Sequence, residues 1–384
     1  MTNTPLKKLL LDTLRRSGPM TFERYMQTCL YHPEFGYYTQ GRERTGVAGD
    51  YFTSSDLHPV FARLLARQAA EMWNAMGCPP LFTWVEMGVG RGVFASDFLS
   101  WSAGVLPDFA AALNYVAIEP GEKQCHAIEA RLAGAGVRER VQLLRNLEEV
   151  APVTGCFFSN ELVDAFPAHV VTRDEGHLKE IYVIAQGDEL GEKMGPISDP
   201  AVAAYVARYA HELEECQRVE VNRMAQAWIR AVAAKLARGF VLTIDYGDTA
   251  DRLFTADRLR GTLLAYRGHV ATEDFFTAPG ETDLTAHVNF SALIDGGKAD
   301  GLEPAGFTTQ ERFLLALGER NQFADVYDPG QNEPDRLRAR LKLKRLISPE
   351  GMGNIFKVLL QQQGFPGAKL MGWKFERQEG GARS

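Results

Sequence analysis

The stretch TWVEMGVGRGVFASDFL, residues 83–99, decides the fold of this 384-residue chain. An apolar run ends at Glu86, glycines follow at Gly88, Gly90 and Gly92, and a helix-like segment comes after them. A strand, a glycine turn and a helix in this order place backbone N–H groups at a helix N-terminus, where glycine lets the backbone approach a ligand closely. The stretch therefore predicts a nucleotide-binding turn.

Short apolar runs alternate with helical patterns over residues 82–185, which favours a mainly parallel sheet with helices on both faces. GFVLTIDYG (239–247) continues this pattern after an interruption. We expect an α/β, doubly wound fold in which residues 1–80 form an N-terminal helical and lid region and residues 81–384 form the ligand-binding domain. The apolar runs are FTWVEMG, NYVAIEP, VQLLRN, GCFFSNE and KEIYVIA.

The interruption at about 188–238 is rich in Ala, Glu and Arg with helical periodicity, and we interpret it as a helical insertion that ends at a C-cap, Gly239. Residues of about 250–290 are loop-rich and are expected to lie on the substrate side. We then expect a helix at SALIDGGKADG, a strand at TTQERF and a closing segment at GNIFKVLLQQ.

Composition excludes several function classes. The formal net charge is −7, which weighs against a dedicated nucleic-acid binder. No apolar stretch approaches the ~20 residues of a membrane span. The five cysteines are scattered and never spaced CxxC, so we expect neither a disulfide framework nor a metal site, and a reducing compartment fits.

Two charged segments have simple interpretations. The N-terminal segment, with Leu6, Leu9, Leu10 and Leu14 at helical spacing, resembles a targeting helix, but an ordinary surface helix is favoured. The basic run RLRARLKLKR (336–345) reads as a solvated amphipathic helix, with Leu337, Leu341 and Leu346 expected on one face.

The glycine turn separates three kinds of nucleotide site. The chain has no GxxxxGK[ST] phosphate loop, and the dinucleotide pattern GxGxxG fails because Val93 holds the third glycine position. The observed GxGxG, with Glu86 before it and Asp97 after it, suits S-adenosylmethionine (SAM). A carboxylate there would repel a pyrophosphate and attract an ammonium or sulfonium group.

Polar residues end two further apolar runs. NYVAIEP ends in Glu119, and an acid at this place accepts hydrogen bonds from ribose hydroxyls in both SAM and dinucleotide sites. GCFFSNELVDAFP stops at Asn160 and Glu161, with Asp164 following, so these polar groups are expected near the transferable methyl. A capped turn into a helix is the alternative interpretation.

Several strings, in order over nearly the whole chain, resemble the MidA-like methyltransferases, a family that includes the mitochondrial complex I assembly-factor methyltransferase. Three departures are Tyr51 in the GDF string, Val89 in the glycine turn and Asn289 in the AHVDF string. The strings are GYY (36–38), GDYFTS (49–54), EMGVGRG, AIEP, NELVDAFP, IDYG (244–247), GTLLAYRGH (261–269), PGETDLTAHVNF (279–290) and GNIFKVL (353–359).

The resemblance implies a Rossmann-like class I SAM-dependent methyltransferase that yields S-adenosylhomocysteine and methylates arginine on a protein substrate. Carried over, it places the GDYFTS loop with Asp50 and Thr53, and the TAHVNF segment with Asp283 and His287, over the cofactor or substrate. The residues implied to bind SAM in the glycine turn and after the second strand are Glu86, Gly88, Gly90, Gly92 and Glu119.

The chemistry needs a guanidinium holder and a proton acceptor. A guanidinium stays protonated, so a carboxylate must hold it and localise its charge. We assign Glu161 as the holder and keep Asp164, Asp245 and His287 as proton acceptors. A structural role for His287 remains equally open.

Three alternatives remain: a SAM-binding assembly factor or chaperone with little catalysis, an NAD-dependent oxidoreductase with a degenerate turn, and a methyltransferase for nucleic acids or small molecules. We expect a cytoplasmic location in a bacterial cell, or the mitochondrial matrix in a eukaryote. The sequence does not predict the oligomeric state.

Overall fold

The computed structural model describes residues 4–41, 46, 49–50 and 53–375, so Tyr51 of the GDYFTS string lies outside the described residues. The chain divides into two compact units, which are described separately. The expected N-terminal region 1–80 contributes to both. Unit 1 comprises Met1–Phe52, Leu162–Ile229 and Gly247–Gly296, and unit 2 comprises Thr53–Glu161, Arg230–Tyr246 and Gly297–Ser384.

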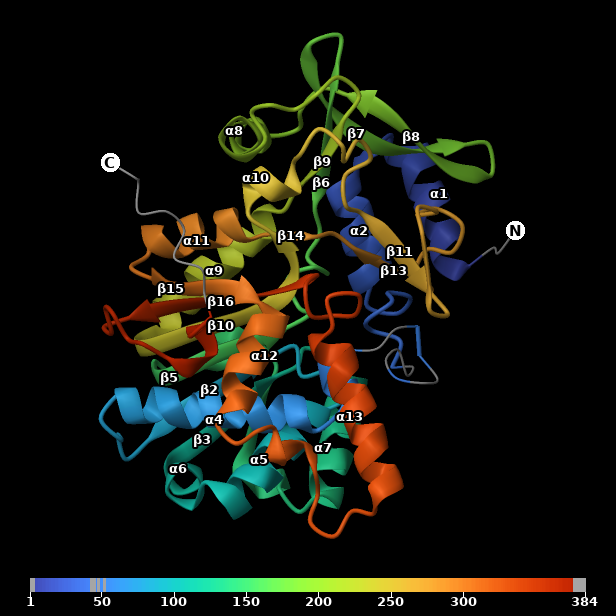
Figure 1. Ribbon diagram of the computed structural model, residues 1–384. Helices are drawn as coiled ribbons and strands as arrows, with labels where there is room; N and C mark the ends of the chain where they lie inside the picture. The colour runs from blue at the N-terminus through green and yellow to red at the C-terminus, as the bar shows by residue number, and fades with distance from the viewer. Residues whose placement is uncertain (1–3, 42–45, 47–48, 51–52, 376–384) are drawn as a thin grey trace, which may run out of the picture. The chain divides into compact units, whose positions relative to one another are not determined.

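Unit 2 contains the predicted mostly parallel sheet (Figure 1), with strand order β15-β16-β10-β5-β2-β3-β4. The strands from β10 to β4 are mutually parallel, whereas β16 runs antiparallel to both β10 and β15. The strands are β2 (Phe82–Met87), β3 (Leu113–Ile118), β4 (Val141–Leu144), β5 (Val153–Asn160), β10 (Leu236–Asp248), β15 (Glu303–Thr309) and β16 (Phe356–Gln363).

The central strands of this sheet are buried because both of their faces are apolar, as parallel sheets require. Trp84 on β2 packs 5.0 Å, between ring centroids, from Phe98 on the following helix and 5.1 Å from Phe158 on β5. The helices in unit 2 are α3 (Ser54–Leu57), α4 (Val60–Ala75), α5 (Val93–Val105), α6 (Pro107–Ala112), α7 (Glu122–Gly134), η1 (Arg138–Arg140), η2 (Leu147–Glu149), α12 (Gln310–Glu319), η3 (Ala324–Val326), α13 (Glu333–Ile347) and η4 (Met371–Trp373).

Unit 1 is built on an antiparallel sheet of order β1-β7-β6-β9, with β8 paired to β7, and a smaller sheet of order β12-β11-β13. The last two residues of β10 pair with β14. The strands are β1 (Met20–Thr21), β6 (His169–Asp174), β7 (His177–Gln186), β8 (Glu189–Gly195), β9 (Arg218–Val221), β11 (Leu264–Arg267), β12 (Val270–Thr272), β13 (Asp283–Thr285) and β14 (Val288–Asn289).

The N-terminal amphipathic segment forms the first helix of unit 1. Of its predicted stripe, Leu6, Leu10 and Leu14 are buried in a core shared with the second helix and the antiparallel sheet, whereas Leu9 is exposed. In the described part of the chain, no helix is long and apolar enough to cross a bilayer. The helices of unit 1 are α1 (Pro5–Ser17), α2 (Phe22–Tyr31), α8 (Pro200–Tyr209), α9 (Arg223–Lys235, which continues into unit 2), α10 (Ala250–Leu253) and α11 (Phe290–Ala299).

Four details of the predicted element pattern are corrected. KEIYVIA forms β7 of the antiparallel sheet instead of a parallel strand. The segment 188–238 is helical at α8 and α9 but also supplies β8 and β9. TTQERF is only half strand, because α12 begins at Gln310.

The fourth correction concerns Gly239, which is not a helix C-cap. The helix ends at Lys235, and Gly239 lies within β10, where a Cβ would stand 1.9 Å from the carbonyl oxygen of Gly155 on β5. Glycine is needed there because the two strands approach closely.

Candidate functional site

The glycine turn lies at a topological switch point of the unit 2 sheet. β2 has β3 on one side and β5 on the other, so the strand order reverses between β2 and β5. In open α/β sheets, ligands bind beyond the carboxyl ends of the strands at such a point. The turn follows β2, and the predicted Asn160–Glu161 pair ends β5, so unit 2 brings these two motifs to the same edge.

The three glycines of the turn all have left-handed backbones, with φ of 73° at Gly88, 58° at Gly90 and 72° at Gly92. This region costs other residues ~1–2 kcal/mol each, so glycine is the residue that forms the turn without strain. Gly92 is the N-cap of α5, and the first-turn N–H groups of a helix need partners from outside the helix. The turn therefore offers donors to a ligand.

The glycines differ in the space beside them. A Cβ built on Gly90 would meet no described atom within 4 Å, outside the adjacent residues, whereas one on Gly92 would lie 3.3 Å from Ile128 Cγ2 on α7. Gly90 thus leaves room for a ligand to approach the backbone. Gly92 also allows α5 and α7 to pack closely.

Glu86 is buried at the end of β2. Its Oε2 accepts a hydrogen bond of 2.6 Å from the hydroxyl of Tyr115 on β3. Burial is the main cause that raises the pKa of Glu86 to about 8; Glu119 adds to the shift and the Tyr115 hydrogen bond opposes it. A cation placed against Glu86 would favour its ionised form, so the residue suits an ammonium group.

Glu119 follows β3 directly, as predicted. Its Oε1 accepts a hydrogen bond of 3.0 Å from the N–H of Gly121, and its own N–H donates to the carbonyl of Leu144 on β4. Because Met87 pairs with Ile118 across β2 and β3, Glu119 lies beside the start of the glycine turn. This is the position of a ribose-binding acid.

Asp97 lies in the second turn of α5, among charged groups from other helices. Burial raises the pKa of Asp97 to about 6, while the charges of Arg63 on α4 and Arg131 on α7 lower it. These neighbours place Asp97 in the helix layer. Its contribution to cofactor binding stays a prediction.

Glu161 has a left-handed backbone, with φ of 53°, immediately after β5. Its Oε1 accepts hydrogen bonds from the N–H of Ser54 at 2.9 Å and from Asn160 Nδ2 at 2.8 Å. Among the described residues, the buried Oδ1 of Asn160 has no hydrogen-bond partner. Strained residues persist where surrounding structure fixes them and concentrate at functional sites. The strand end therefore holds a fixed carboxylate and an unused acceptor.

The short helix α3 connects this strand end to the glycine turn. Thr53 and Asp56 form a reciprocal capping box, and Asp56 also lies 3.6 Å from Arg91 in the turn. At the same helix start, the Ser54 N–H holds Glu161. Unit 2 thus connects the predicted residues Thr53 and Glu161 through Ser54 and Asp56, which were not predicted. The string TSSD has the spacing of a capping box, so Asp56 could have been found from the sequence.

Of the remaining predicted residues, Asp245 is buried in β10 of unit 2. The others belong to unit 1, where aspartates and tyrosines gather. Asp50 accepts hydrogen bonds from Tyr37 at 2.8 Å and from the N–H of Gly268 at 2.7 Å. Tyr38 donates to Asp283 at 2.9 Å. Unit 1 therefore holds these carboxylates among phenols.

Asp164 and His287 are fixed next to this group. Burial raises the pKa of Tyr266, and the nearby charges of Asp164 and Asp283 raise it further. The carbonyl of Asp164 accepts a hydrogen bond from the N–H of Ala286, and the N–H of His287 donates to Thr262 Oγ1 at 3.0 Å. We refer to Tyr37, Tyr38, Asp50, Asp164, Tyr266 and Asp283 as the aspartate–tyrosine cluster.

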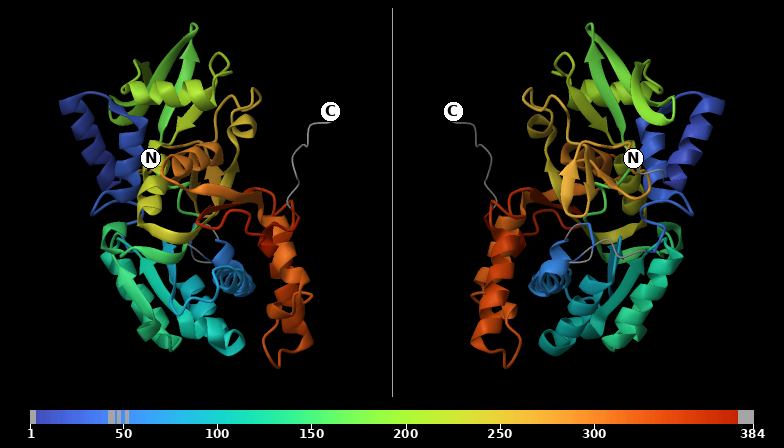
Figure 2. Two further views of the ribbon diagram at one scale, coloured as in Figure 1. Left: turned by 90° about the vertical axis from the view of Figure 1, so that its left-hand side faces the viewer. Right: turned by 90° about the vertical axis from the view of Figure 1, so that its right-hand side faces the viewer.

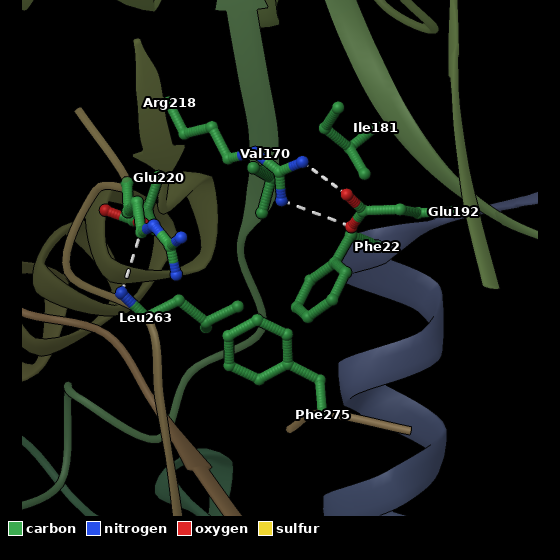
Figure 3. A pocket seen from close by; sticks show the side chains of 9 residues that line it. Phe22, Val170, Ile181, Glu192, Arg218, Glu220, Leu263 and Phe275 are labelled. Atoms are coloured by element: carbon green, nitrogen blue, oxygen red, sulfur yellow. Dashed lines mark hydrogen bonds and ion pairs between the residues drawn. The ribbon is translucent and has the colours of Figure 1, made fainter. Parts of the chain in front are cut away.

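A separate small cavity in unit 1 contains none of the predicted residues (Figure 3). Arg218 points toward Glu192 and forms an ion pair with it, and Glu220 accepts a hydrogen bond from the N–H of Leu263. The interior has room for about one water molecule. The cavity is therefore too small for a substrate. The residues described also contain no group of His, Cys, Asp and Glu that could hold a metal ion.

The chain is similar to several known proteins. Residues 64–308 match the family described as "Putative S-adenosyl-L-methionine-dependent methyltransferase". The mouse protein named protein arginine methyltransferase NDUFAF7, mitochondrial, is 27% identical over 92% of this chain and 83% of its own length. The human protein of that name is 27% identical over 97% of this chain and 86% of its own length.

A solved structure is similar over the whole chain. It is a Burkholderia thailandensis protein bound to S-adenosyl-homocysteine, with a TM-score of 0.88 and 30% identity, covering 97% of each chain. A native crystal structure of a protein from the same organism has a TM-score of 0.84 and 29% identity, covering 97% of this chain and 96% of that one.

Proposed function

Because the chain belongs to the family of S-adenosyl-L-methionine-dependent methyltransferases and takes SAM as its cofactor, we propose that it methylates arginine on a protein substrate. The proposal rests on one observation above all, the fixed carboxylate of Glu161 at the end of β5. The dinucleotide alternative is not retained, since the family and its SAH-bound neighbour indicate SAM.

The residues of unit 2 fit this cofactor. The open space beside Gly90 lets a ligand reach the backbone of the turn. The Oδ1 atom of Asn160 can accept a hydrogen bond from a ligand, because no described residue donates to it. Glu119 follows β3, the position at which an acidic residue binds ribose in such folds. Glu86 supplies a carboxylate for an ammonium group. We assign Gly90, Glu119 and Glu86 to cofactor binding and keep Asn160 at the reacting centre, while Thr53 acts through the capping box of α3. When bound, SAM supplies a methyl group on a sulfonium, which is open to in-line attack.

Glu161 is suited to hold the guanidinium. The Ser54 N–H and the Asn160 amide fix the Glu161 carboxylate before substrate binds. Substrate binding therefore costs little conformational entropy at this side chain. A carboxylate that binds two guanidinium N–H groups localises the positive charge near itself and leaves the far nitrogen more nucleophilic. A proton must leave that nitrogen, and Asp164, Asp245 and His287 remain the proposed acceptors.

The named relatives also support an arginine acceptor. The matches to the two relatives named arginine methyltransferases span 92% and 97% of this chain at 27% identity. We further propose a cytoplasmic location in a bacterial cell.

The test is transfer of labelled methyl from SAM into a lysate of cells that lack this protein. We expect label in protein, recovered as methylated arginine by mass spectrometry. Glu161→Gln should lower the rate on the order of 100-fold, since misplaced reacting groups have effects of that size, and SAM affinity should stay within a few-fold.

Glu175→Gln is the matched control. Glu175 also has a left-handed backbone, with φ of 50°, but lies exposed in the turn between β6 and β7 of unit 1. It should keep full activity. Label in nucleic acid or small molecules would reject the arginine proposal, and SAM binding without any transfer would instead support the assembly-factor alternative.

A further inference from the structure

Helix α13 has two faces with different surroundings. Ala339, Leu343 and Leu346 are buried against the rest of unit 2. Leu337 and Leu341, one helical turn apart, point to the opposite side, where they are 52% and 56% exposed. The expected face was therefore wrong in including the buried Leu346. Both panels of Figure 2 show α13, in orange-red, at the edge of unit 2 with one long side that no other ribbon covers.

The exposed leucines are flanked by basic residues on both sides. Helical spacing places Arg338 and Arg345 along one side of the leucine pair and Arg340 and Lys344 along the other. The helix carries six basic and two acidic residues, in a chain whose formal net charge is −7. This local charge is opposite to that of the whole chain.

The two acids of α13 lie in its first turn and neutralise only part of this charge. Asp335 pairs with Arg338 at 2.5 Å and Glu333 pairs with Arg340 at 2.6 Å. Both pairs are exposed, so each contributes little to stability and can exchange for a partner's carboxylate at small cost. Lys344 and Arg345 extend the basic surface to the C-terminal end of the helix.

We propose that this face of α13 binds an acidic protein segment that carries two apolar side chains one helical turn apart. Leucines at i and i+4 are the anchors by which helices dock on protein partners. Basic residues on both sides would pair with acidic residues that flank the partner's apolar side chains. The docking face is additional to the methyl-transfer site and does not depend on the identity of the methyl acceptor.

Two other occupants fit less well. A helix that lies in a membrane interface usually presents a wide apolar face with aromatic residues, whereas this face has two leucines and no aromatic. Nucleic acid would place its phosphates against the central leucines, which can make no charged contact. The charge and the apolar pair together favour an acidic protein segment.

The test uses a labelled synthetic helical peptide in which two leucines at i and i+4 are flanked by glutamates, titrated with the full chain. We expect saturable binding that weakens as salt rises. A double variant, Leu337→Glu with Leu341→Glu, should bind at least about tenfold more weakly, a loss equivalent to ~1.4 kcal/mol. A peptide with lysines in place of the glutamates should not bind.

Leu81→Glu is the matched control, since Leu81 is 58% exposed just before β2 in the same unit and outside α13. It should bind the acidic peptide as the unmodified chain does. Absence of saturable binding, equal binding by the double variant, or tighter binding to phosphatidylcholine–phosphatidylserine vesicles or to duplex RNA would overturn the proposal. If the double variant does not fold, the proposal is tested by comparing how the acidic and the lysine peptides bind to the unmodified chain.

Discussion

The hydroxyl of Tyr115 donates a 2.6 Å hydrogen bond to the carboxylate of Glu86, and both side chains are buried between β2 and β3. The pair joins the core of the unit 2 sheet to the glycine turn that begins two residues later. Because burial raises the pKa of Glu86 to about 8, protonation of this carboxyl group falls within the physiological pH range.

Glu86 should make stability depend on pH. Its pKa rises from 4.5 to about 8 on folding, so between these values the folded chain binds more protons than the unfolded chain. The contribution of Glu86 to the free energy of unfolding is therefore fully present below pH 4.5 and is lost as the pH rises toward 8. In thermal unfolding, the stability of Glu86→Gln should decline less steeply between pH 4.5 and 8 than that of the unmodified chain.

In Tyr115→Phe the loss of stability with rising pH should continue to higher pH than in the unmodified chain. The reason is that the substitution removes the hydrogen bond that lowers the pKa of Glu86. Tyr182→Phe is the control, since its hydroxyl donates to a carbonyl, that of Pro196, and not to a carboxylate. Identical pH profiles for Tyr115→Phe and the unmodified chain would show that the hydrogen bond does not set the titration of Glu86.

Glu119→Ala should weaken SAM binding about tenfold to hundredfold, because a charged acceptor of hydrogen bonds contributes ~1.5–3 kcal/mol. Calorimetric titration with SAM measures the change. Glu122→Ala, an exposed first-turn residue of α7, should leave affinity unchanged. Equal affinity in the Glu119 variant would remove its ribose assignment.

Gly90→Ala should lose SAM binding while the chain still folds, because the new Cβ enters the open space beside the turn. The backbone strain is about 1–2 kcal/mol. Gly136→Ala reproduces this strain in unit 2, with φ of 70° and likewise nothing within 4 Å, but far along the sequence from the turn. If both variants bind SAM equally, the cofactor does not occupy the space beside Gly90.

Thr53→Ala should lower methyl transfer more than it lowers stability. The capping hydroxyl contributes about 1 kcal/mol, and its loss loosens the helix start that holds Glu161. Thr309→Ala removes the equivalent cap of α12, where the side chain accepts from Arg312 N–H. Both should lower the melting temperature similarly, and only Thr53→Ala should reduce kcat; equal kcat values would count against a role for α3.

The sequence predicted the core of the fold well because its strands are continuous apolar runs. The strands β2, β3, β4 and β5 correspond to the runs FTWVEMG, NYVAIEP, VQLLRN and GCFFSNE. An apolar run of this kind can be identified as a strand from its own residues, without knowledge of the strands that pair with it. The short antiparallel strands were harder. β9 has four residues, and its strand conformation depends on pairing with β6, which lies far away in the sequence.

The sequence predicted the site residues that belong to short local motifs. It did not predict the contacts that depend on how distant strands and helices are placed. The GxGxG turn and the acid after β3 are visible in short strings. Tyr115 lies 29 residues from Glu86, and Ser54 lies 107 residues from Glu161, so only the paired strands and the placement of α3 reveal these contacts.

The left-handed backbone of Glu161 also limits which amino acids can replace it over evolutionary time. Branched side chains such as Val, Ile and Thr are strongly disfavoured at this φ, whereas Gly, Asn and Asp are tolerated. A homologous gene that no longer needs the carboxylate should therefore drift first to glycine at this codon. The residue found there can serve as a marker that separates genes for active transferases from genes for proteins that only bind the cofactor.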